Sequence, residues 1–469
     1  MSLFENSSNL FLNNTAIISD TGSKLSYSEL ENFSKILSNK INPRSLVFSF
    51  NNNTLGSIIG YYSFIKNKVV PFMLDSKIDN TQVKNLISIY KPQYLWLPTL
   101  KLPEFDNYHV ICSVKNYSLI KSSINQKVQL QKDLAILLST SGSTGSPKFV
   151  KISYNNIKSN TLSIIKYLSI KSNEKAITTL PMSYSYGLSI INSHFHTGAT
   201  VLLTDLSFFD KKFWNFLKNE KATSISGVPY TYEMLKKLRF TKMELPYLKT
   251  LTQAGGKMNA SLTKEIADYC INNEKRLFIM YGQTEATARM SYLPTQYTLS
   301  KIDSMGIAIP GGKFSLVDES QNLINKSNVV GELVYEGPNV SMGYANCLKD
   351  LSKNDENNGK LFTGDLALRD DDDFYYIKGR KKRFLKIYGN RINLDETERL
   401  LKEIVEECAC VGSDERVVVY ITDEKKINLV KNFISSKLGL NRLGFLIKHI
   451  KSIPKNSSGK ILYSDLKIL

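Results

Sequence analysis

The sequence predicts an α/β protein with a large N-terminal domain of helix-covered sheets, a more antiparallel part, and a small α+β domain at the C-terminus. Two observations predict this class. Up to about residue 290, short apolar runs alternate with longer segments whose apolar residues recur every three to four positions, as in a parallel sheet covered by helices. After residue 300, glycine and proline interrupt the pattern and β-rich segments follow one another.

The first part of the chain supplies most of the predicted elements. Residues 155–168 and 261–270 have the apolar spacing of amphipathic helices. Continuous apolar stretches predict buried strands at 45–50, 68–74, 134–138, 199–203, 250–253 and 276–280.

Two boundaries divide the rest of the chain. Segments 313–318 and 331–337 predict a more antiparallel, barrel-like part over about 300–379. A cationic run at 379–383 separates it from helical patterns at 394–407 and 429–438 and a strand pattern at 417–421. We therefore expect an N-terminal domain of residues 1–379, a short connecting run at 380–383, and a C-terminal domain of residues 384–469.

Composition and charge exclude several classes. Hydrophobic residues make up 42% and charged residues 22% of the chain, which excludes wholesale disorder. The net charge of +18 attracts polyanions such as nucleotide phosphates or an acidic carrier protein, although a general lysine-rich bias explains it as well. Nucleic acid is a disfavoured partner because the sequence has no zinc finger, RNA-binding signature or basic–aromatic stripe.

Cysteine and histidine spacing indicates the compartment. The five cysteines include no Cys-x-x-Cys pair and the four histidines have no metal-ligand spacing, so we expect neither a disulfide framework nor a zinc site. A reducing, cytoplasmic location fits this usage. No transmembrane helix is expected, because no run of about 18 apolar residues occurs. No secretory signal is visible either.

The most informative segment is a loop rich in hydroxyl side chains that follows a buried strand. Hydroxyls and glycine-exposed amides can surround phosphate oxygens, and a lysine supplies positive charge. The glycine spacing is not that of a Walker A loop, and a flexible loop is the alternative on these residues alone. The proposed phosphate-binding residues are Thr140, Ser141, Gly142, Ser143, Thr144, Gly145 and Lys148.

This loop resembles the signature loop of the adenylate-forming (AMP-binding) superfamily of acyl-CoA synthetases, adenylation domains and luciferases. Further motifs of that superfamily follow in the expected order as far as the C-terminus. They are Tyr281-Gly-Gln-Thr-Glu-Ala286, the segment from Gly331-Glu-Leu to Gly343-Tyr344, Thr363-Gly-Asp365, Gly379-Arg380 with Lys386 and Gly389-x-Arg391, and Asn456-Ser-Ser-Gly-Lys460.

The resemblance implies an ATP-dependent carboxylate ligase. A carboxylate would attack the α-phosphate of ATP to form an acyl-adenylate and pyrophosphate, and a thiol would then displace AMP. The implied cofactors are ATP and Mg²⁺, and the implied acceptor is CoA or the phosphopantetheine of an acidic acyl or peptidyl carrier protein. An amine acceptor, which would give an amide, is the alternative.

The resemblance also implies a role for each motif residue. Glu285 would bind Mg²⁺, Thr284 would contact the α-phosphate, and Lys460 would bridge the substrate carboxylate and the α-phosphate. Asp365 would accept hydrogen bonds from the ribose, and Arg380 would contact ribose or phosphate. Lys382 would be the hinge residue, with residues 380–383 as the hinge of a small mobile C-terminal domain. The other implied nucleotide-binding residues are Ala254, Gly255, Gly256, Tyr281, Gly282, Gln283 and Lys386.

The acid itself is not named by these motifs. Tyr184 stands where acyl ligases often have histidine, and residues 182–188 contain no acid to pair with the ammonium group of an α-amino acid. The candidate pocket residues have mixed polarity, which favours a small or polar acid over a long fatty chain, although each could equally be a core residue. They are Tyr184, Ser185, His194, Tyr230 and Met280.

Overall fold

The computed structural model forms two compact units. Among the described residues, unit 1 comprises those within 3–139, 149–313 and 336–361, and unit 2 comprises those within 314–335 and 362–467. The residues that the structure describes are 3–4, 10–105, 107–122, 128–139, 149–387, 390–413, 416–438, 440–456 and 459–467.

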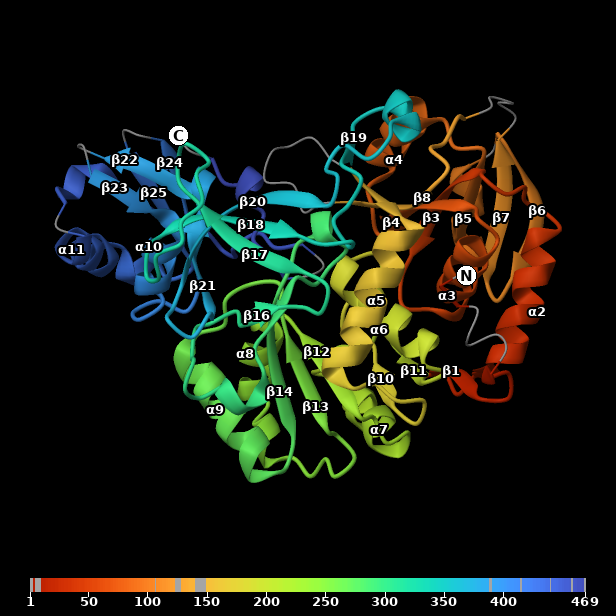
Figure 1. The fold of residues 1–469 in the computed structure, drawn as a ribbon, viewed down its shortest axis with the longest axis horizontal. Coiled ribbons are helices and arrows are strands. Elements are labelled where there is room, and N and C mark those ends of the chain that lie inside the picture. The colour runs from red at the N-terminus through yellow and green to blue at the C-terminus, as the bar shows by residue number, and fades with distance from the viewer. Residues whose placement is uncertain are drawn as a thin grey trace. The chain divides into compact units, whose positions relative to one another are not determined.

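Unit 1 contains two large sheets (Figure 1). The nine-stranded sheet has the order β16 (Ile307–Ala308), β15 (Ser291–Tyr292), β14 (Arg276–Tyr281), β13 (Thr250–Gln253), β12 (Ser224–Gly227), β10 (Lys175–Ile177), β11 (Thr200–Leu203), β1 (Thr15–Ser19) and β2 (Lys24–Ser26). The eight-stranded sheet has the order β19 (Tyr344–Ala345), β9 (Phe149–Ser153), β8 (Leu134–Ser139), β4 (Val70–Asp75), β3 (Leu46–Asn51), β5 (Tyr94–Pro98), β7 (Tyr117–Ser122) and β6 (Tyr108–Val114).

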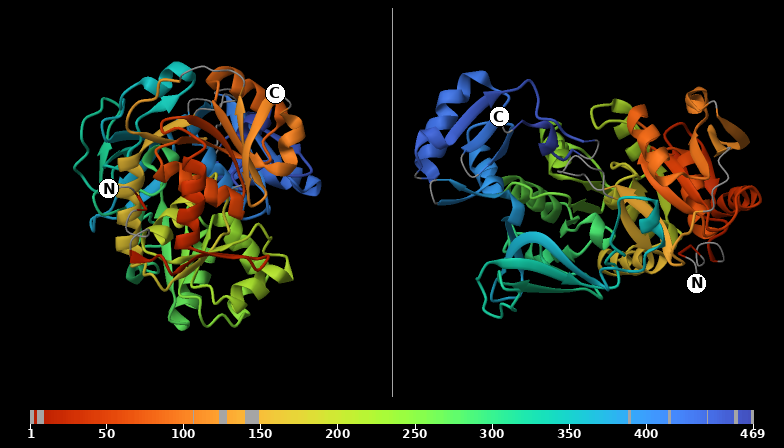
Figure 2. Two further views of the ribbon diagram at one scale, coloured as in Figure 1. Left: turned by 90° about the vertical axis from the view of Figure 1, so that its right-hand side faces the viewer. Right: turned by 90° about the horizontal axis from the view of Figure 1, so that it is seen from above.

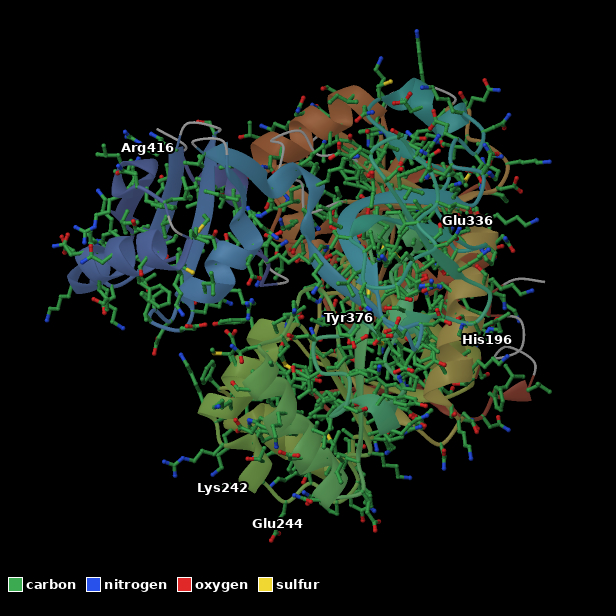
Figure 3. The ribbon with its side chains drawn as sticks, turned by 60° about the vertical axis from the view of Figure 1, so that its left-hand side comes forward. His196, Lys242, Glu244, Glu336, Tyr376 and Arg416 are labelled. Atoms are coloured by element: carbon green, nitrogen blue, oxygen red, sulfur yellow. The ribbon has the colours of Figure 1, made fainter. Side chains whose placement is uncertain are left out.

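Helices pack between these sheets and over their outer faces. One apolar core contains side chains from both sheets together with α2 (Tyr27–Ser38), α3 (Leu55–Lys66), α5 (Tyr154–Leu168) and α6 (Ser185–His196). The outer face of the eight-stranded sheet is covered by α4 (Asn80–Tyr90). The nine-stranded sheet is covered by α7 (Lys211–Asn219), α8 (Pro229–Lys237) and α9 (Ala260–Asn272). Charged residues after α8, such as Lys242 and Glu244, extend into solvent (Figure 3).

The sequence of β9 and α5 shows why a helix begins at residue 154. The Ser153 hydroxyl accepts the Asn156 N–H at 3.1 Å, and the Asn156 side chain accepts the Ser153 N–H at 2.9 Å. This reciprocal capping satisfies two backbone donors that the first helical turn leaves open. The helix then buries its apolar face, including Ile157 and Ile164, against the core.

Unit 2 contains a four-stranded sheet and a small α+β part. The sheet has the order β17 (Lys313–Val317), β18 (Gly331–Glu336), β20 (Lys360–Arg369) and β21 (Tyr375–Arg380). The strands after it are β22 (Phe384–Ile387) with β23 (Asn390–Asn393), and β24 (Cys408–Ser413), β25 (Arg416–Ile421) and β26 (Phe445–His449). The α/β class with an N-terminal body of helix-covered sheets and a C-terminal α+β part is therefore confirmed.

The small C-terminal sheet is covered on both faces. Helices α10 (Leu394–Leu401) and α11 (Ile427–Leu438) pack on one face (Figure 2). The chain after β26 packs on the other face through Ile453, Ile461 and Leu466. The predicted helix at 394–407 is therefore too long, because α10 ends at Leu401. None of the helices in the described residues has the length and hydropathy that a membrane crossing requires.

Candidate active site

The carboxyl ends of three neighbouring parallel strands carry the predicted nucleotide-binding motifs of unit 1. Strands β12, β13 and β14 run parallel in continuous register. Residues 254–256 follow β13 directly, and residues 282–285 follow β14 directly. Ligands bind at this edge of open parallel sheets, so the fold brings the two predicted motifs to the edge where a nucleotide can reach both.

The turn after β13 presents a small, flat surface. The Ala254 N–H donates to the Gly227 carbonyl at 3.1 Å, and the Gln253 side chain donates to the Gly256 carbonyl at 2.8 Å. Gly255 has φ +84°, a conformation that side chains strongly disfavour. With no bulky side chain at 254–256, a planar base can approach this backbone closely.

The turn after β14 is fixed by a close backbone crossing. A Cβ at Gly282 would lie 1.7 Å from the Ala288 carbonyl oxygen, so only glycine fits there. The chain then forms a short 3₁₀ turn over Thr284–Ala286. The Thr284 hydroxyl oxygen lies 3.1 Å from that of Ser185, the first residue of α6. The Gln283 side chain donates to the Tyr281 hydroxyl at 3.1 Å.

Glu285 is held by residues that lie far from it in the sequence. Its carbonyl accepts the Ser341 N–H at 2.8 Å, and its carboxylate accepts the Tyr344 hydroxyl at 2.7 Å. Partial burial, followed by the Glu285 charge, raises the pKa of Tyr344, so this phenol stays protonated and donates. The contact holds the carboxylate in one orientation.

The donor set around Glu285 fits a magnesium ion. Mg²⁺ prefers hard oxygen ligands and is commonly bound by one or two carboxylates together with substrate phosphates. Within the described residues, no cluster of three or more histidine, cysteine, aspartate or glutamate side chains could hold a metal without such help. A single oriented carboxylate beside a threonine hydroxyl suits an ion that a nucleotide brings with it.

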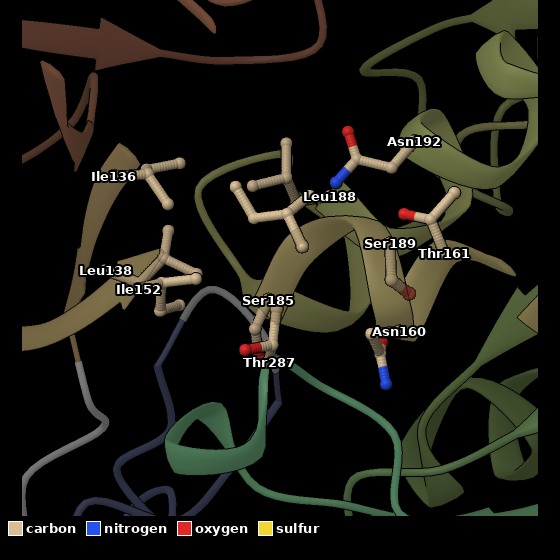
Figure 4. Close-up of a pocket in the computed structure, with 11 residues that line it drawn as sticks. Ile136, Leu138, Ile152, Asn160, Thr161, Ser185, Leu188, Ser189, Asn192 and Thr287 are labelled. Atoms are coloured by element: carbon tan, nitrogen blue, oxygen red, sulfur yellow. The ribbon is translucent and has the colours of Figure 1, made fainter. Parts of the chain in front are cut away.

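A small cavity adjoins this turn (Figure 4). In Figure 4, Ser185 and Thr287 lie close together at one end, apolar side chains of β8 and β9 lie on one side, and polar side chains of α5 and α6 lie on the other. The lining residues are Ile136, Leu138, Ile152, Ile157, Asn160, Thr161, Ser185, Leu188, Ser189, Asn192 and Thr287. Of the predicted pocket residues, this cavity includes Ser185 alone.

The other predicted pocket residues do not line the first cavity. Tyr184 precedes the helix, and burial raises its pKa to about 12. His194 lines a second cavity next to the same helix. The sulfur of Met280 accepts the Tyr167 hydroxyl at 3.1 Å. Tyr230 is 38% exposed and lines neither cavity.

Two residues of this region were missed by the sequence reasoning. Tyr344 was noted only as part of a motif, and Arg289 was not noted at all. Arg289 is 2% exposed at the end of the turn that begins at Gly282. A lone cation between Ala288 and Met290 was the available signal, because a charged side chain in an apolar context is rarely buried without a reason.

In unit 2, Asp365 and Arg380 face each other across two strands. They are direct partners in the antiparallel pair of β20 and β21, and their side chains form an ion pair at 3.3 Å. The Asp365 side chain is 6% exposed, whereas that of Arg380 is 58% exposed. The Asp365 N–H donates to the Thr363 hydroxyl at 3.1 Å. A buried carboxylate backed by an exposed guanidinium can accept two hydroxyl donors while the cation remains accessible.

The predicted hinge residue lies between two differently anchored neighbours. Lys381 forms an ion pair with Glu332 of β18 at 2.8 Å. Arg383 forms ion pairs with Asp395 and with Glu398, the latter at 2.7 Å, and lies over the Tyr463 ring. Lys382 itself is exposed within the short 3₁₀ turn Lys381–Arg383.

Lys460 follows a tight turn. The Asn456 N–H donates to the Lys460 carbonyl and the Lys460 N–H donates to the Asn456 side chain, both at 2.9 Å. Gly459 has φ +77°, which favours glycine. An isolated bridge between Lys455 and Ile461 closes the turn.

Some predicted site residues lie outside the described residues. These are the whole hydroxyl-rich loop, with Thr140, Ser141, Gly142, Ser143, Thr144, Gly145 and Lys148, and the side chain of Lys386. The strands on either side of the loop are described: β8 and β9 are antiparallel, with Ser139 opposite Phe149. The loop therefore connects the two strands of a hairpin.

Fold and motifs together define a class of enzyme that activates a carboxylic acid by adenylation. Comparison with known proteins agrees, because the model of a family described as "AMP-binding enzyme" matches residues 4–345. The chain belongs to this AMP-binding enzyme family. It is an AMP-forming acid–thiol ligase, as the sequence predicted.

Individual relatives are distant. A 2-succinylbenzoate–CoA ligase of Bacillus cereus is 26% identical over 361 residues, which are 74% of this chain and 72% of the relative. The structure of an O-succinylbenzoate coenzyme A synthetase from Bacillus subtilis in complex with AMP matches with a TM-score of 0.82 at 20% identity, covering 99% of this chain and 98% of that one. The same enzyme in complex with ATP and magnesium ion matches with a TM-score of 0.81 at 19% identity, covering 99% of both chains.

Proposed function

We propose that this protein uses ATP and Mg²⁺ to couple a small carboxylic acid to CoA, with its reacting centre at the turn after β14. The observation that carries this proposal is the 3.1 Å contact between Thr284 and Ser185. Thr284 belongs to the predicted phosphate-binding turn, and Ser185 lines the cavity beside it. An acid in that cavity would thus have its carboxylate next to the α-phosphate.

In the first half-reaction, a carboxylate oxygen attacks the α-phosphorus and pyrophosphate leaves with the bonding electron pair. Two anions must approach each other, so catalysis depends on positive charge and alignment. We assign Thr284 to the α-phosphate and Lys460 to the space between carboxylate and phosphate. Lys148 and the hydroxyls of its loop would hold the departing phosphates.

Glu285 would hold the magnesium ion, in the orientation that Tyr344 imposes. When bound, Mg²⁺ supplies charge neutralisation on the phosphate oxygens. Asp365 would accept the ribose hydroxyls, and Arg380 would contact ribose or phosphate. Residues 254–256 would lie against the adenine, and Tyr281, Gly282, Gln283 and Lys386 would complete the nucleotide site.

In the second half-reaction, the acceptor sulfur attacks the acyl carbon and AMP leaves with the bonding electrons. CoA is the proposed acceptor, in keeping with the names of the relatives. A carrier-bound phosphopantetheine is the second candidate, and the net charge of +18 favours it because carrier proteins are acidic. The acid to test first is 2-succinylbenzoate, on which the named relatives act.

Both half-reactions need the same centre, so we propose that residues 384–469 rotate about Lys382 between them. The anchoring of the neighbours supports this pivot, because Lys381 pairs with β18 whereas Arg383 pairs with α10. Within the described residues, the hydrogen bonds that cross the pivot include one from the Arg380 N–H to Asp395 at 3.2 Å and one from Asn393 to the Lys378 carbonyl. A short run between two bodies can absorb a domain rotation in few backbone angles.

The test is acid-dependent exchange of labelled pyrophosphate into ATP with 2-succinylbenzoate and other carboxylic acids. Glu285→Gln should lower the exchange by about 10²-fold or more, because the carboxylate that holds the metal is lost. Glu244→Gln is the matched control, since Glu244 is an exposed carboxylate that belongs to none of the site motifs. Normal exchange by Glu285→Gln would contradict the assignment of the metal to Glu285.

A further inference from the structure

Arg289 is a buried cation for which the adenylation chemistry described above has no use. Its side chain is 2% exposed, beside a cavity in unit 1 whose lining includes several serine and threonine residues. Removing a guanidinium from water costs several kcal/mol unless an anion compensates the charge. We therefore ask which groups around Arg289 compensate its positive charge.

Its protein partners are all neutral. The Arg289 Nε donates to the Ser189 hydroxyl at 3.1 Å, and one terminal nitrogen donates to the Tyr167 hydroxyl at 3.1 Å and lies 3.5 Å from the Met280 sulfur. The guanidinium carbon lies 5.0 Å from the centre of the Tyr186 ring. Burial raises the pKa of both Tyr167 and Tyr186, so neither phenol supplies a negative charge.

No carboxylate in the described residues forms an ion pair with Arg289. One carboxylate, Glu174, lines the same cavity. The charges that act on Glu174 are those of Arg276, Lys249 and Lys171. A desolvated cation–π contact offsets only part of the cost of burying the guanidinium. Among the described residues, the positive charge of Arg289 is thus left without an anion.

The surroundings of Arg289 point to a polar ligand. Arg289 and His194 line the second cavity beside α6. The His194 Nδ1 lies 2.8 Å from the Ile190 carbonyl, whereas its buried Nε2 has no hydrogen-bond partner. Burial, with a smaller contribution from the Arg289 charge, lowers the pKa of His194 to about 4, so the imidazole is neutral and does not repel a cation.

Arg289 also lies at a distance from the reacting centre that a single small ligand can span. Its partner Ser189 lines the first cavity together with Ser185, which contacts Thr284. Ser185 and Ser189 are four residues apart in α6, so they are separated by about 6 Å along the helix axis. A ligand with its reacting carboxylate at Ser185 would extend one helical turn to reach the guanidinium.

We propose that Arg289 binds a second carboxylate of the acid substrate, so that this enzyme activates dicarboxylic acids. The proposal rests on the proposed function and adds the residue that selects the substrate. The distal carboxylate forms a charge-assisted hydrogen-bonded pair with the guanidinium. A monocarboxylic acid of the same shape leaves the buried cation unpaired and is used poorly.

The experiment compares each dicarboxylic acid with its own monoamide in the pyrophosphate exchange assay. The pairs are 2-succinylbenzoate with its two monoamides, and adipate with adipamate. The wild-type protein should prefer the dicarboxylic acid by about 30-fold or more in kcat/KM, because an unpaired buried charge is strongly unfavourable. Arg289→Met should reduce this ratio to near one, and Arg289→Lys should restore part of it.

The control variant is Arg276→Met, which removes a partly buried arginine that also donates to neutral groups but has Glu174 nearby. Its preference ratio should equal that of the wild type. Equal use of acid and monoamide by the wild-type protein would overturn the proposal, and so would an unchanged ratio in Arg289→Met. If no acid of either kind supports exchange, the proposed function fails instead. A merely structural role of Arg289 would lower both rates and leave their ratio unchanged.

Discussion

The Tyr344 hydroxyl orients the carboxylate of Glu285, the proposed metal ligand. This hydroxyl reaches Glu285 across 59 positions of sequence, from β19 of the eight-stranded sheet to the turn that follows β14 of the nine-stranded sheet. Residues that orient a metal ligand commonly contribute 10- to 100-fold to metal affinity. The Glu285 carboxylate would be free to rotate without this bond.

Tyr344→Phe should therefore weaken magnesium binding more than it slows the reaction at saturating magnesium. We expect the Mg²⁺ concentration for half-maximal pyrophosphate exchange to rise by about 10-fold. Tyr247→Phe, at an exposed tyrosine, is the control. An unchanged Mg²⁺ requirement in Tyr344→Phe would show that the hydroxyl does not act through the metal site.

Lys460→Ala should separate the two half-reactions. Its charge is proposed to act where carboxylate and phosphate meet, so adenylate formation should fall by about 10²- to 10⁴-fold. Thioester formation from pre-made acyl-adenylate should continue, because that step no longer brings these anions together. The exposed Lys451 supplies the control variant Lys451→Ala. Equal loss of both half-reactions would instead indicate a structural role for Lys460.

Motif residues could be predicted from the sequence, and their partners could not. Glu285 and Thr284 occur in a short string that fixes their chemistry and their place after a strand. The contacts that position them come from Tyr344 and Ser185, which approach only when the sheets and α6 have formed. Likewise, the proposed role of Arg289 depends on the lack of a carboxylate partner among the described residues around it. Its neighbours in sequence do not predict this.

Helix α6 links the two cavities and also carries a titratable residue. Burial lowers the pKa of His194 to about 4, whereas an unfolded chain has a histidine pKa near 6.5. Above pH 6.5, His194 is neutral in both the folded and the unfolded state, so it does not lower the free energy of unfolding. As the pH falls from about 6.5 towards 4, only the unfolded chain takes up a proton, so stability is lost.

His194→Gln should remove this part of the pH dependence. The loss between pH 7 and pH 4 attributable to His194 is at most about 3 kcal/mol. We expect the urea midpoint of the wild type to fall more between pH 7 and pH 5 than that of His194→Gln. His109→Gln, at an exposed histidine, should behave like the wild type. Parallel pH profiles for wild type and His194→Gln would contradict the predicted shift.

Central elements were predicted better than their ends and the sheet edges. Buried strands such as β13 are continuous apolar runs, so their positions follow from the sequence. Helix α10 ends at Leu401 although apolar spacing continues, because Val405 reaches the same core from a turn. The antiparallel edge strand β6 and its neighbour β7 were not predicted, since residues 108–114 of β6 include polar residues and depend on pairing with β7 for their conformation.

At the scale of the whole molecule, the proposed mechanism requires a movement of the C-terminal part. The sequence predicted boundaries at 379 and 383 from a run of basic residues. The ion pairs of this run explain why it can be a boundary. Lys381 pairs with Glu332 of β18, whereas Arg383 pairs with Glu398 of α10. The domain boundary remains a prediction.

Lys382→Pro should impair the second half-reaction selectively. Proline fixes φ near −65° and removes one backbone donor, which restricts rotation at this position. We expect adenylate formation to persist while transfer to CoA falls by about 10-fold or more, measured as separate half-reactions. Lys382→Ala keeps the backbone freedom and is the control for the lost charge. Wild-type rates in both half-reactions of Lys382→Pro would place the pivot elsewhere.

The central claim is that this protein activates a carboxylic acid by adenylation. The most direct measurement is the identity of the nucleotide products when the protein is incubated with ATP, Mg²⁺, CoA and 2-succinylbenzoate or another dicarboxylic acid that supports exchange. The account predicts one AMP and one pyrophosphate for each thioester formed, and accumulation of the acyl-adenylate when CoA is omitted. Formation of ADP and phosphate with the thioester would contradict it.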